Sequence, residues 1–264
     1  MLDILAEQNA VDPRGYSLTL EQFEKIPQFD KLPPRSILEI GPGSGHFSIM
    51  LGERFPDAQI LGIDTNALSV EVARGNLIYA KFMGEGDGYL NNVNFKKTSV
   101  RLEEGANTAD IITTTSINHH ISSFTDFLRR VKSTGKRAFI FNDLVRSPGC
   151  YAKAYLFLEI IRRVGIEPFV HFSRFLPSFV LSPTSLKAID DYGLIFAATR
   201  PGLDLVIDGG ILSVARSFTM DELKTAFRDA GYKEGALHCD VQSWMEQWLV
   251  LGLCRMGCYA SLTD

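Results

Sequence analysis

The sequence predicts an α/β fold in which a doubly wound, mostly parallel sheet of seven strands carries a helical insertion. Three observations support this fold class. From Ser36 onward, short apolar runs alternate with amphipathic segments of helical period, which is the pattern of a parallel sheet covered by helices on both faces. The first apolar run ends in a glycine-rich bend, Gly41–Gly45. The second ends in Asp64, about 20 residues further on, where doubly wound sheets often place an acid that contacts their ligand.

The elements follow in order from this alternation. We expect strands at 36–40, 59–64, 93–98, 109–115 and 137–144, and a final pair at about 234–241 and 247–258. Helices are expected at about 45–54, 68–82 and 124–133. A further helix should begin after Thr219, a good N-cap followed by acids, and should end at Gly231, a natural C-cap.

The domain organisation is expected to have four parts. Residues 1–35 form an N-terminal helical segment, closed by Pro33 and Pro34, and residues 36–149 form the core. The strand–helix alternation stops after 149, and residues 150–207 are an apolar, aromatic-rich helical insertion that we expect to act as a lid. Residues 208–264 contribute a helix and the strands that complete the sheet.

The composition excludes several classes of protein. Apolar residues make up 45% and charged residues 22%, which fits a folded globule, and the net charge of −4 comes without any basic cluster that would indicate nucleic-acid binding. The four cysteines show neither C-x-x-C nor zinc-ligand spacing, so we expect no metal site, reduced thiols and a cytoplasmic location. No apolar run approaches the ~20 residues that span a membrane.

Three glycines, Gly41, Gly43 and Gly45, fall within five positions of the first bend. Backbone N–H groups at a helix start are unpaired and can face a ligand, although a tight structural turn would also require glycines. Glu39, near the end of a buried strand, and Asp64 favour a ligand, since both carboxylates would lie at the carboxyl edge of the sheet. The sequence therefore predicts a nucleoside site.

The glycine spacing distinguishes two nucleoside classes. A dinucleotide fold prefers G-x-G-x-x-G, but His46 stands where its third glycine would be. The observed E-x-G-x-G-x-G pattern resembles motif I of class I S-adenosylmethionine-dependent methyltransferases. The resemblance implies a Rossmann-like fold in which Glu39 lies near the amino-acid end of S-adenosyl-L-methionine and Asp64 binds its ribose. Further cofactor contacts implied in this way are Thr65, Asn66 and Thr115.

The resemblance extends along the chain. The stretches 109–120, ADIITTTSINHH, 139–147, FIFNDLVRS, and 211–219, ILSVARSFT, are similar to small-molecule methyltransferases related to quinone-biosynthesis and polyketide-cluster enzymes. One departure concerns adenine recognition. Many members carry an acid at the end of the third strand, where this chain has Thr98, Ser99 and Val100, so Ser99 and the Val100 backbone N–H are the expected substitutes.

Methyl transfer to a hydroxyl needs a base, and His119 and His120 follow the fourth strand, where the methyl group should emerge. Aromatic O-methyltransferases of this fold often hold their catalytic histidine at the matching place, and this resemblance favours His119. The alternative is that these histidines cap a helix or pack beneath the cofactor. The expected acceptor-pocket residues are Asn142, Asp143, Tyr16 and His171. The alternative is a solvated loop end for Asn142 and Asp143 and packing for His171, while Tyr16 is also a candidate to close over the cofactor.

The expected function is methyl transfer from S-adenosylmethionine to a lipophilic or aromatic small molecule of secondary metabolism, with O-methylation favoured. A homodimer is compatible with this, with the N-terminal segment and the lid packed across a two-fold axis. Two alternatives stay open. One is a peptide methyltransferase, and the other is a methyltransferase-like protein that binds the cofactor but serves as a non-methylating catalyst or regulatory partner.

Overall fold

The computed structural model describes residues 13–84, 88–98, 109–147, 155, 159, 163, 215–242 and 253–263. The chain divides into two compact units. One comprises Met1–Asp143, Leu223–Asp240 and Gly257–Asp264, and the other comprises Leu144–Glu222 and Val241–Met256. The expected lid at 150–207 falls outside the described residues apart from 155, 159 and 163, so it stays a prediction.

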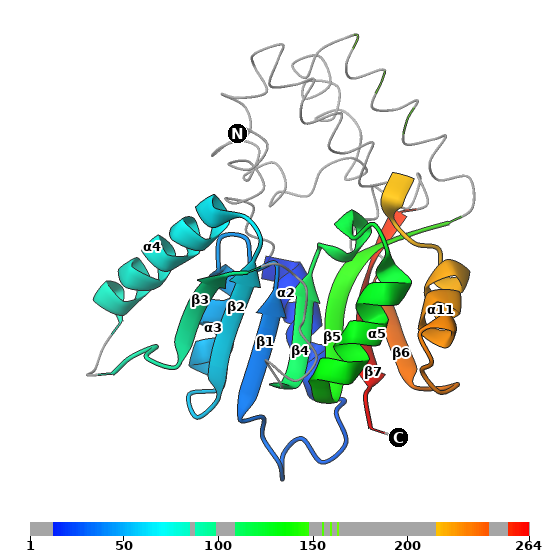
Figure 1. Cartoon of the computed structure of the whole chain (residues 1–264). Helices are drawn as coiled ribbons and strands as arrows, with labels where there is room; N and C mark the ends of the chain where they lie inside the picture. The colour runs from blue at the N-terminus through cyan, green and yellow to red at the C-terminus, as the bar shows by residue number, and fades with distance from the viewer. Residues whose placement is uncertain are drawn as a thin grey trace, which may run out of the picture. The chain divides into compact units, whose positions relative to one another are not determined.

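A seven-stranded sheet in the order β3-β2-β1-β4-β5-β7-β6 confirms the predicted α/β fold (Figure 1). β1 pairs in parallel with β2 and β4, β2 with β3, and β4 with β5. The strand order reverses between β1 and β4, which is where doubly wound sheets bind ligands. The strands are β1 (Ser36–Ile40), β2 (Gln59–Asp64), β3 (Val93–Lys97), β4 (Ala109–Thr115), β5 (Gly135–Arg146), β6 (Leu237–Gln242) and β7 (Leu253–Ser261).

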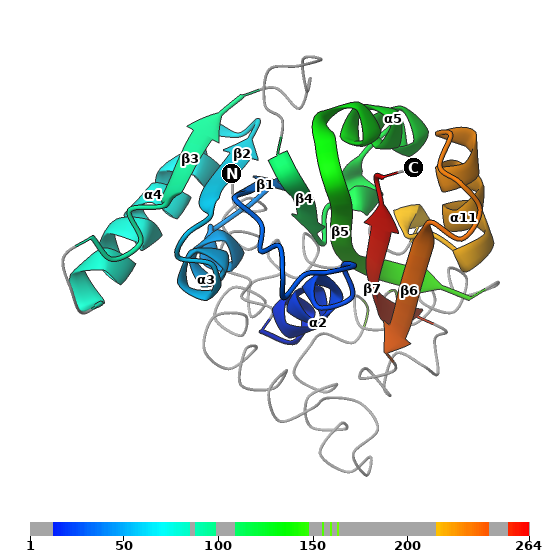
Figure 2. The same ribbon diagram turned by 90° about the horizontal axis from the view of Figure 1, so that it is seen from below.

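The helices are α2 (Pro13–Phe23), α3 (His46–Arg54), α4 (Ala67–Met83), the 3-10 helix η1 (Asn118–His120), α5 (Phe124–Thr134) and α11 (Met220–Asp229). α2, α3 and α4 cover one face of the sheet, and α5 and α11 cover the other (Figure 2). α11 begins with the predicted cap, since the Thr219 hydroxyl accepts from the Glu222 N–H at 3.2 Å and the Glu222 carboxylate accepts from the Thr219 N–H at 2.7 Å.

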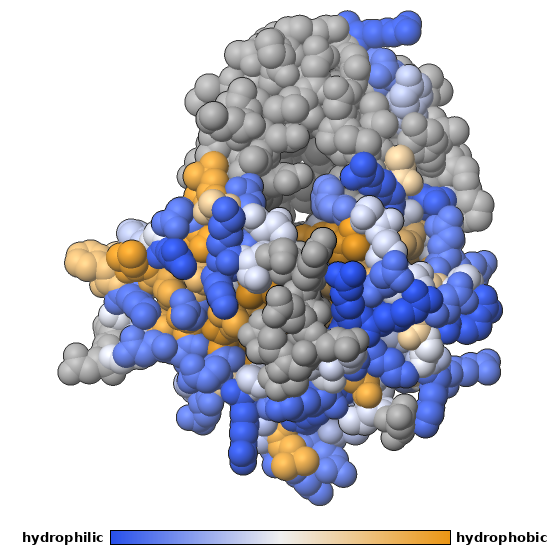
Figure 3. Space-filling view, viewed as in Figure 1, coloured by the Kyte–Doolittle hydropathy of each residue, from blue (hydrophilic) through white to orange (hydrophobic). Residues whose placement is uncertain are grey.

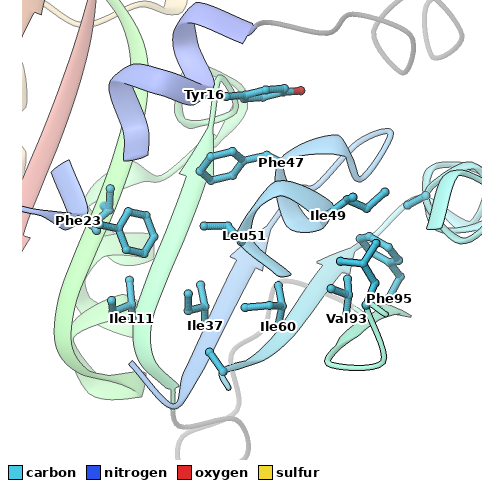
Figure 4. Packing of buried hydrophobic residues seen from close by; sticks show 14 of the residues in the cluster. Tyr16, Phe23, Ile37, Phe47, Ile49, Leu51, Ile60, Val93, Phe95 and Ile111 are labelled. Carbon is cyan, nitrogen blue, oxygen red and sulfur yellow. The ribbon is translucent and has the colours of Figure 1, made fainter. Parts of the chain in front are cut away.

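A buried apolar cluster joins the first face of the sheet to α2, α3 and α4 (Figure 4). Tyr16 of α2 stacks on Phe47 of α3, with ring centroids 5.2 Å apart. On the opposite face the core is aromatic, because Phe139 and Phe141 of β5 stack at 5.0 Å and Phe227 of α11 lies 5.9 Å from Phe141. Both faces of the central strands are thus buried, which explains their nearly continuous apolar sequence.

The last two strands make the sheet mixed and correct one expectation. β7 runs opposite to β6 (Figure 2), with the Ser261 N–H donating to the Ala236 carbonyl at 3.0 Å. Counting along both strands from this pair places Cys239 directly opposite Cys258, with Cα atoms 4.2 Å apart, and the two form a disulfide. The expectation that all thiols are reduced is therefore wrong for this pair. Strand register, and not sequence spacing, brings them together.

α2 docks against these same strands. The Asp240 carboxylate of β6 accepts a hydrogen bond from Gln22 at 3.0 Å and pairs with Lys25. Gly257 of β7 leaves no room for a side chain, because an added Cβ would lie 2.6 Å from Leu18 of α2. The N-terminal helix is thus fixed by residues near the other end of the chain.

Membrane-spanning helices and metal-binding clusters are both absent from the described residues. No described helix combines the length and the hydropathy needed to cross a bilayer. Within the same residues, no group of three or more His, Cys, Asp or Glu side chains is placed to hold a metal ion.

Candidate active site

The bend between β1 and α3 has a left-handed backbone at each of its glycines. The φ angles are +69° at Gly41, +54° at Gly43 and +78° at Gly45, a region that residues with side chains adopt at a cost. The Gly41 N–H donates to the Ile63 carbonyl of β2, and the Gly45 N–H to the Pro42 carbonyl, both at 2.8 Å. The bend is thus held at the carboxyl edge of the sheet, where β1 and β2 end.

The three glycines are required for different reasons. A Cβ added at Gly41 would lie 2.8 Å from the Ile117 side chain, and one at Gly45 would lie 2.7 Å from Phe95. A Cβ at Gly43 would meet no described residue within 4 Å. Protein packing therefore accounts for Gly41 and Gly45, as the structural-turn alternative expects, while Gly43 presents bare backbone that no described side chain covers.

Glu39 is fully buried beside this bend. Its carboxylate accepts hydrogen bonds from the Ser48 hydroxyl of α3 and from the Thr115 hydroxyl of β4, the latter at 3.3 Å. Burial raises the pKa of Glu39 from its ordinary 4.5 to about 7; the two hydroxyls oppose this change, and the charge of Asp64 adds to it. No basic side chain is described as pairing with Glu39, so this site favours a ligand that brings a positive charge.

Asp64 ends β2 on the other side of the bend. Its Oδ1 accepts from the Asn66 N–H at 2.8 Å. Burial raises the pKa of Asp64, and the backbone N–H groups of Asn66, Gly43 and Thr65 partly oppose the rise. The contact with Gly43 connects this carboxylate to the open part of the bend.

The two residues after Asp64 are also predicted cofactor contacts. The Asn66 side chain caps α4, accepting from the Leu68 N–H at 3.0 Å, and Thr65 is exposed to solvent. The backbone N–H groups of Thr65 and Asn66 bond to the Asp64 carboxylate, so both residues lie at the site. Their contacts with a cofactor stay a prediction.

Polar side chains that sequence reasoning missed hold the bend in shape. The Ser44 hydroxyl lies 2.6 Å from His46 Nδ1, and the Asn76 amide of α4 donates to the Ser44 carbonyl at 2.9 Å. Burial lowers the pKa of His46, so its imidazole is neutral at physiological pH. Ser48 was missed as well. The signal for Ser48 in the sequence is a hydroxyl side chain in the first turn of a helix, directly after a strand that carries a buried acid.

The predicted catalytic histidines lie in η1, directly after β4. The Thr114 hydroxyl donates to Asn118 Oδ1 at 2.9 Å, and the Asn118 N–H donates to the Asp143 carboxylate at 2.7 Å, so η1 is tied to both β4 and β5. His120 is exposed, and His119 lies between it and Asn118. Their role as a base stays a prediction.

The predicted acceptor residues on β5 and α2 are buried. Asn142 donates to the Thr19 hydroxyl of α2 and accepts from the Ser116 hydroxyl at 3.2 Å, so it connects α2 and β5 with the residue that follows β4. Asp143 orients η1, and Tyr16 packs in the core. Contacts of these residues with an acceptor stay predictions. Three other predicted site residues, Ser99, Val100 and His171, lie outside the described residues.

Comparisons with known proteins point in one direction. Residues 38–136 match the family model described as methyltransferase domain. The chain is 33% identical over 72 residues to methyltransferase str3 of Strobilurus tenacellus, which is 27% of this chain and 26% of that protein. It is 38% identical over 60 residues to trans-aconitate 2-methyltransferase of Rhodopseudomonas palustris strain BisB5, 23% of each chain. The chain thus spans about a quarter of these curated relatives.

A solved structure covers much more of the chain. The plantazolicin methyltransferase BpumL, in complex with a triazolic desmethylPZN analog and SAH, aligns with a TM-score of 0.58. The alignment covers 98% of this chain and 89% of that one, at 15% sequence identity. The similarity in fold thus covers more of the chain than residues 38–136, which the family model matches.

Proposed function

We propose that this chain, whose residues 38–136 match a methyltransferase domain, transfers a methyl group from S-adenosylmethionine to a lipophilic or aromatic small molecule, with oxygen as the favoured acceptor atom. The observation that carries the proposal is the open backbone face at Gly43, which bonds to the Asp64 carboxylate in the bend that follows the strand of the buried Glu39.

The described residues fit this cofactor. Asp64, close to Gly43, is placed to accept hydrogen bonds from the ribose hydroxyls. Glu39, buried and described with no cationic side chain beside it, is suited to a positively charged amino-acid end. When bound, the cofactor would supply a methyl group activated by a sulfonium. The protein then has to align the acceptor and exclude water, and His119 after β4 would take the proton of an acceptor hydroxyl.

The substrate class rests on the aromatic-rich segment 150–207, which we propose to be a lid over the sheet edge. Two of the similar proteins are named for small-molecule or natural-product substrates, trans-aconitate and plantazolicin, and this supports a small acceptor. Cytoplasmic location and a role in secondary metabolism stay part of the proposal.

The test of cofactor binding is calorimetric titration of the full chain with S-adenosylhomocysteine. Asp64→Ala should weaken binding about 10- to 150-fold, the range expected for hydrogen bonds to a charged group. Asp57→Ala, which removes an exposed acid from the turn before β2, is the matched control and should leave affinity unchanged. Equal affinities for wild type and Asp64→Ala would contradict the ribose assignment.

The test of turnover is formation of S-adenosylhomocysteine on incubation with S-adenosylmethionine and lipophilic phenols, amines and short peptides. Product formed with the phenols supports the proposed acceptor class. Tight cofactor binding without turnover on any of these acceptors would instead favour a non-methylating role, and turnover on peptides alone would favour a peptide methyltransferase.

A further inference from the structure

One face of α4 is apolar and exposed. Five of the eight large apolar side chains that are exposed among the described residues lie on this helix: Leu68, Ile78, Tyr79, Phe82 and Met83. Phe82 is 82% and Tyr79 65% exposed. Figure 3 shows hydrophobic residues gathered along α4 in the orientation of Figure 1. A large aromatic side chain has a total surface of about 150–250 Å², so Tyr79 and Phe82 together expose about 300 Å². For comparison, the largest apolar patch of a typical monomer is about 300–600 Å².

The exposed face has the spacing of a helix–helix seam. Leu68, Val72, Gly75, Tyr79 and Phe82 follow one another at intervals of four and three residues. This is the interval at which apolar residues line the contact between two packed helices. Because Val72 is half-buried and the others are exposed, the stripe runs along the outer side of α4, away from the sheet.

Gly75 marks the centre of this stripe. Glycine inside a helix is about 1 kcal/mol less favourable than alanine, so it calls for a reason. Gly52 of α3 has one, since a Cβ there would clash with Val93, whereas a Cβ at Gly75 would meet no atom of the described residues within 4 Å. The contacts within the described chain therefore give no reason for Gly75, and close approach by another helix would give one.

We propose that the occupant of this face is a second copy of the chain, whose α4 packs antiparallel to the first across a two-fold axis at Gly75. In this arrangement Gly75 meets its own copy, where two bare backbones can approach closely. Leu68 then faces Phe82 of the second copy, so a smaller side chain meets a larger one. The proposal does not depend on the proposed catalytic function.

The charges of α4 are compatible with this packing. Glu71 and Arg74 pair within the helix at 3.0 Å, and the Lys81 ammonium donates to Asn91 at 3.1 Å. In the antiparallel arrangement Glu71 lies level with Tyr79 and Arg74 lies level with Asn76 of the second copy. No two like charges of α4 meet, as a self-complementary interface requires.

The experiment is sedimentation velocity of the full chain between about 1 and 100 μM. We expect wild type to dimerise and the double variant Tyr79→Glu/Phe82→Glu to raise the dissociation constant at least about 30-fold, which corresponds to about 2 kcal/mol. Leu32→Glu, at an exposed apolar residue outside α4, is the matched control and should dimerise as wild type does. Circular dichroism and melting temperature verify that the variants are folded.

Oxidative cross-linking tests the register. Gly75→Cys should give a covalent dimer that wild type does not give, and Leu68→Cys alone should not, because in the antiparallel pair it faces Phe82. A monomeric wild type at 100 μM would overturn the proposal, as would a dimer that survives Tyr79→Glu/Phe82→Glu. So would efficient cross-linking through Leu68→Cys, or a monomer that binds phosphatidylcholine vesicles through this face.

Discussion

The buried Glu39 should make the stability of the protein depend on pH. Its pKa rises on folding from 4.5 to about 7, about 2.5 pH units at about 1.4 kcal/mol each, so the ionised group opposes folding by about 3 kcal/mol. Between these two pH values the folded state binds more protons than the unfolded state. The free energy of unfolding therefore falls as pH rises from 4.5 to about 7, and the loss persists at higher pH.

The perturbation that isolates this effect is Glu39→Gln. Glutamine has nearly the same shape and can bond to both the Ser48 and Thr115 hydroxyls, since a hydroxyl both donates and accepts. Near pH 4.5 the variant and wild type should have similar stability. At pH 8 the variant should be the more stable by about 3 kcal/mol, because it buries no charge.

The assay is urea denaturation of ligand-free protein at pH 5, 6, 7 and 8, with the free energy of unfolding compared between variant and wild type. Glu24→Gln removes a surface carboxylate, and this control should show the wild-type dependence on pH. Parallel curves for wild type and Glu39→Gln would refute the reasoning. Such curves would mean that Glu39 is charged and compensated in the folded protein at every pH tested.

Three further predictions concern the bend, the disulfide and the base. Gly45→Ala should lower the free energy of unfolding by about 2–4 kcal/mol through its clash with Phe95. Gly43→Ala should lower it by only about 1 kcal/mol, yet it should abolish S-adenosylhomocysteine binding in calorimetry. Tight binding by Gly43→Ala would contradict the open-face assignment. Cys239→Ser should lower the free energy of unfolding by about 3 kcal/mol in urea denaturation, because the disulfide closes a loop with a sequence separation of 19. The control Cys150→Ser should not lower it. Equal stability of Cys239→Ser and wild type would argue against the bond. His119→Ala should reduce kcat about 10²- to 10⁴-fold with little change in KM, and wild-type turnover would exclude it as the base.

Strand positions could be read from the sequence because buried parallel strands are short apolar runs with clear limits. The predicted limits of β1, β2 and β4 coincide with those of the structure. β5 is longer than its apolar run, ending at Arg146, since Val145 pairs with Phe218 and the Arg146 N–H donates to the Phe218 carbonyl. That extension depends on a partner far away in the chain, which a local pattern cannot reveal.

The site could be predicted to a similar extent and for the same reason. Glu39 and Asp64 were identifiable because each is an acid at the end of an apolar strand. The directions of side chains could not be read from the sequence, so the different reasons for Gly41, Gly43 and Gly45 became visible only in three dimensions. The disulfide was missed for a related reason, because antiparallel register determines which cysteines face each other.

The docking of α2 has a consequence for how the chain is made. Gln22 and its partner Asp240 are separated by 218 positions, so a ribosome adding about 5–20 residues per second exposes α2 roughly 10–45 s before that partner emerges. During this interval Leu18, which lies against Gly257 of β7 in the folded protein, has no final strand to pack against. Newly made chains therefore present a hydrophobic segment that chaperones can capture, and folding is completed only when β6 and β7 arrive.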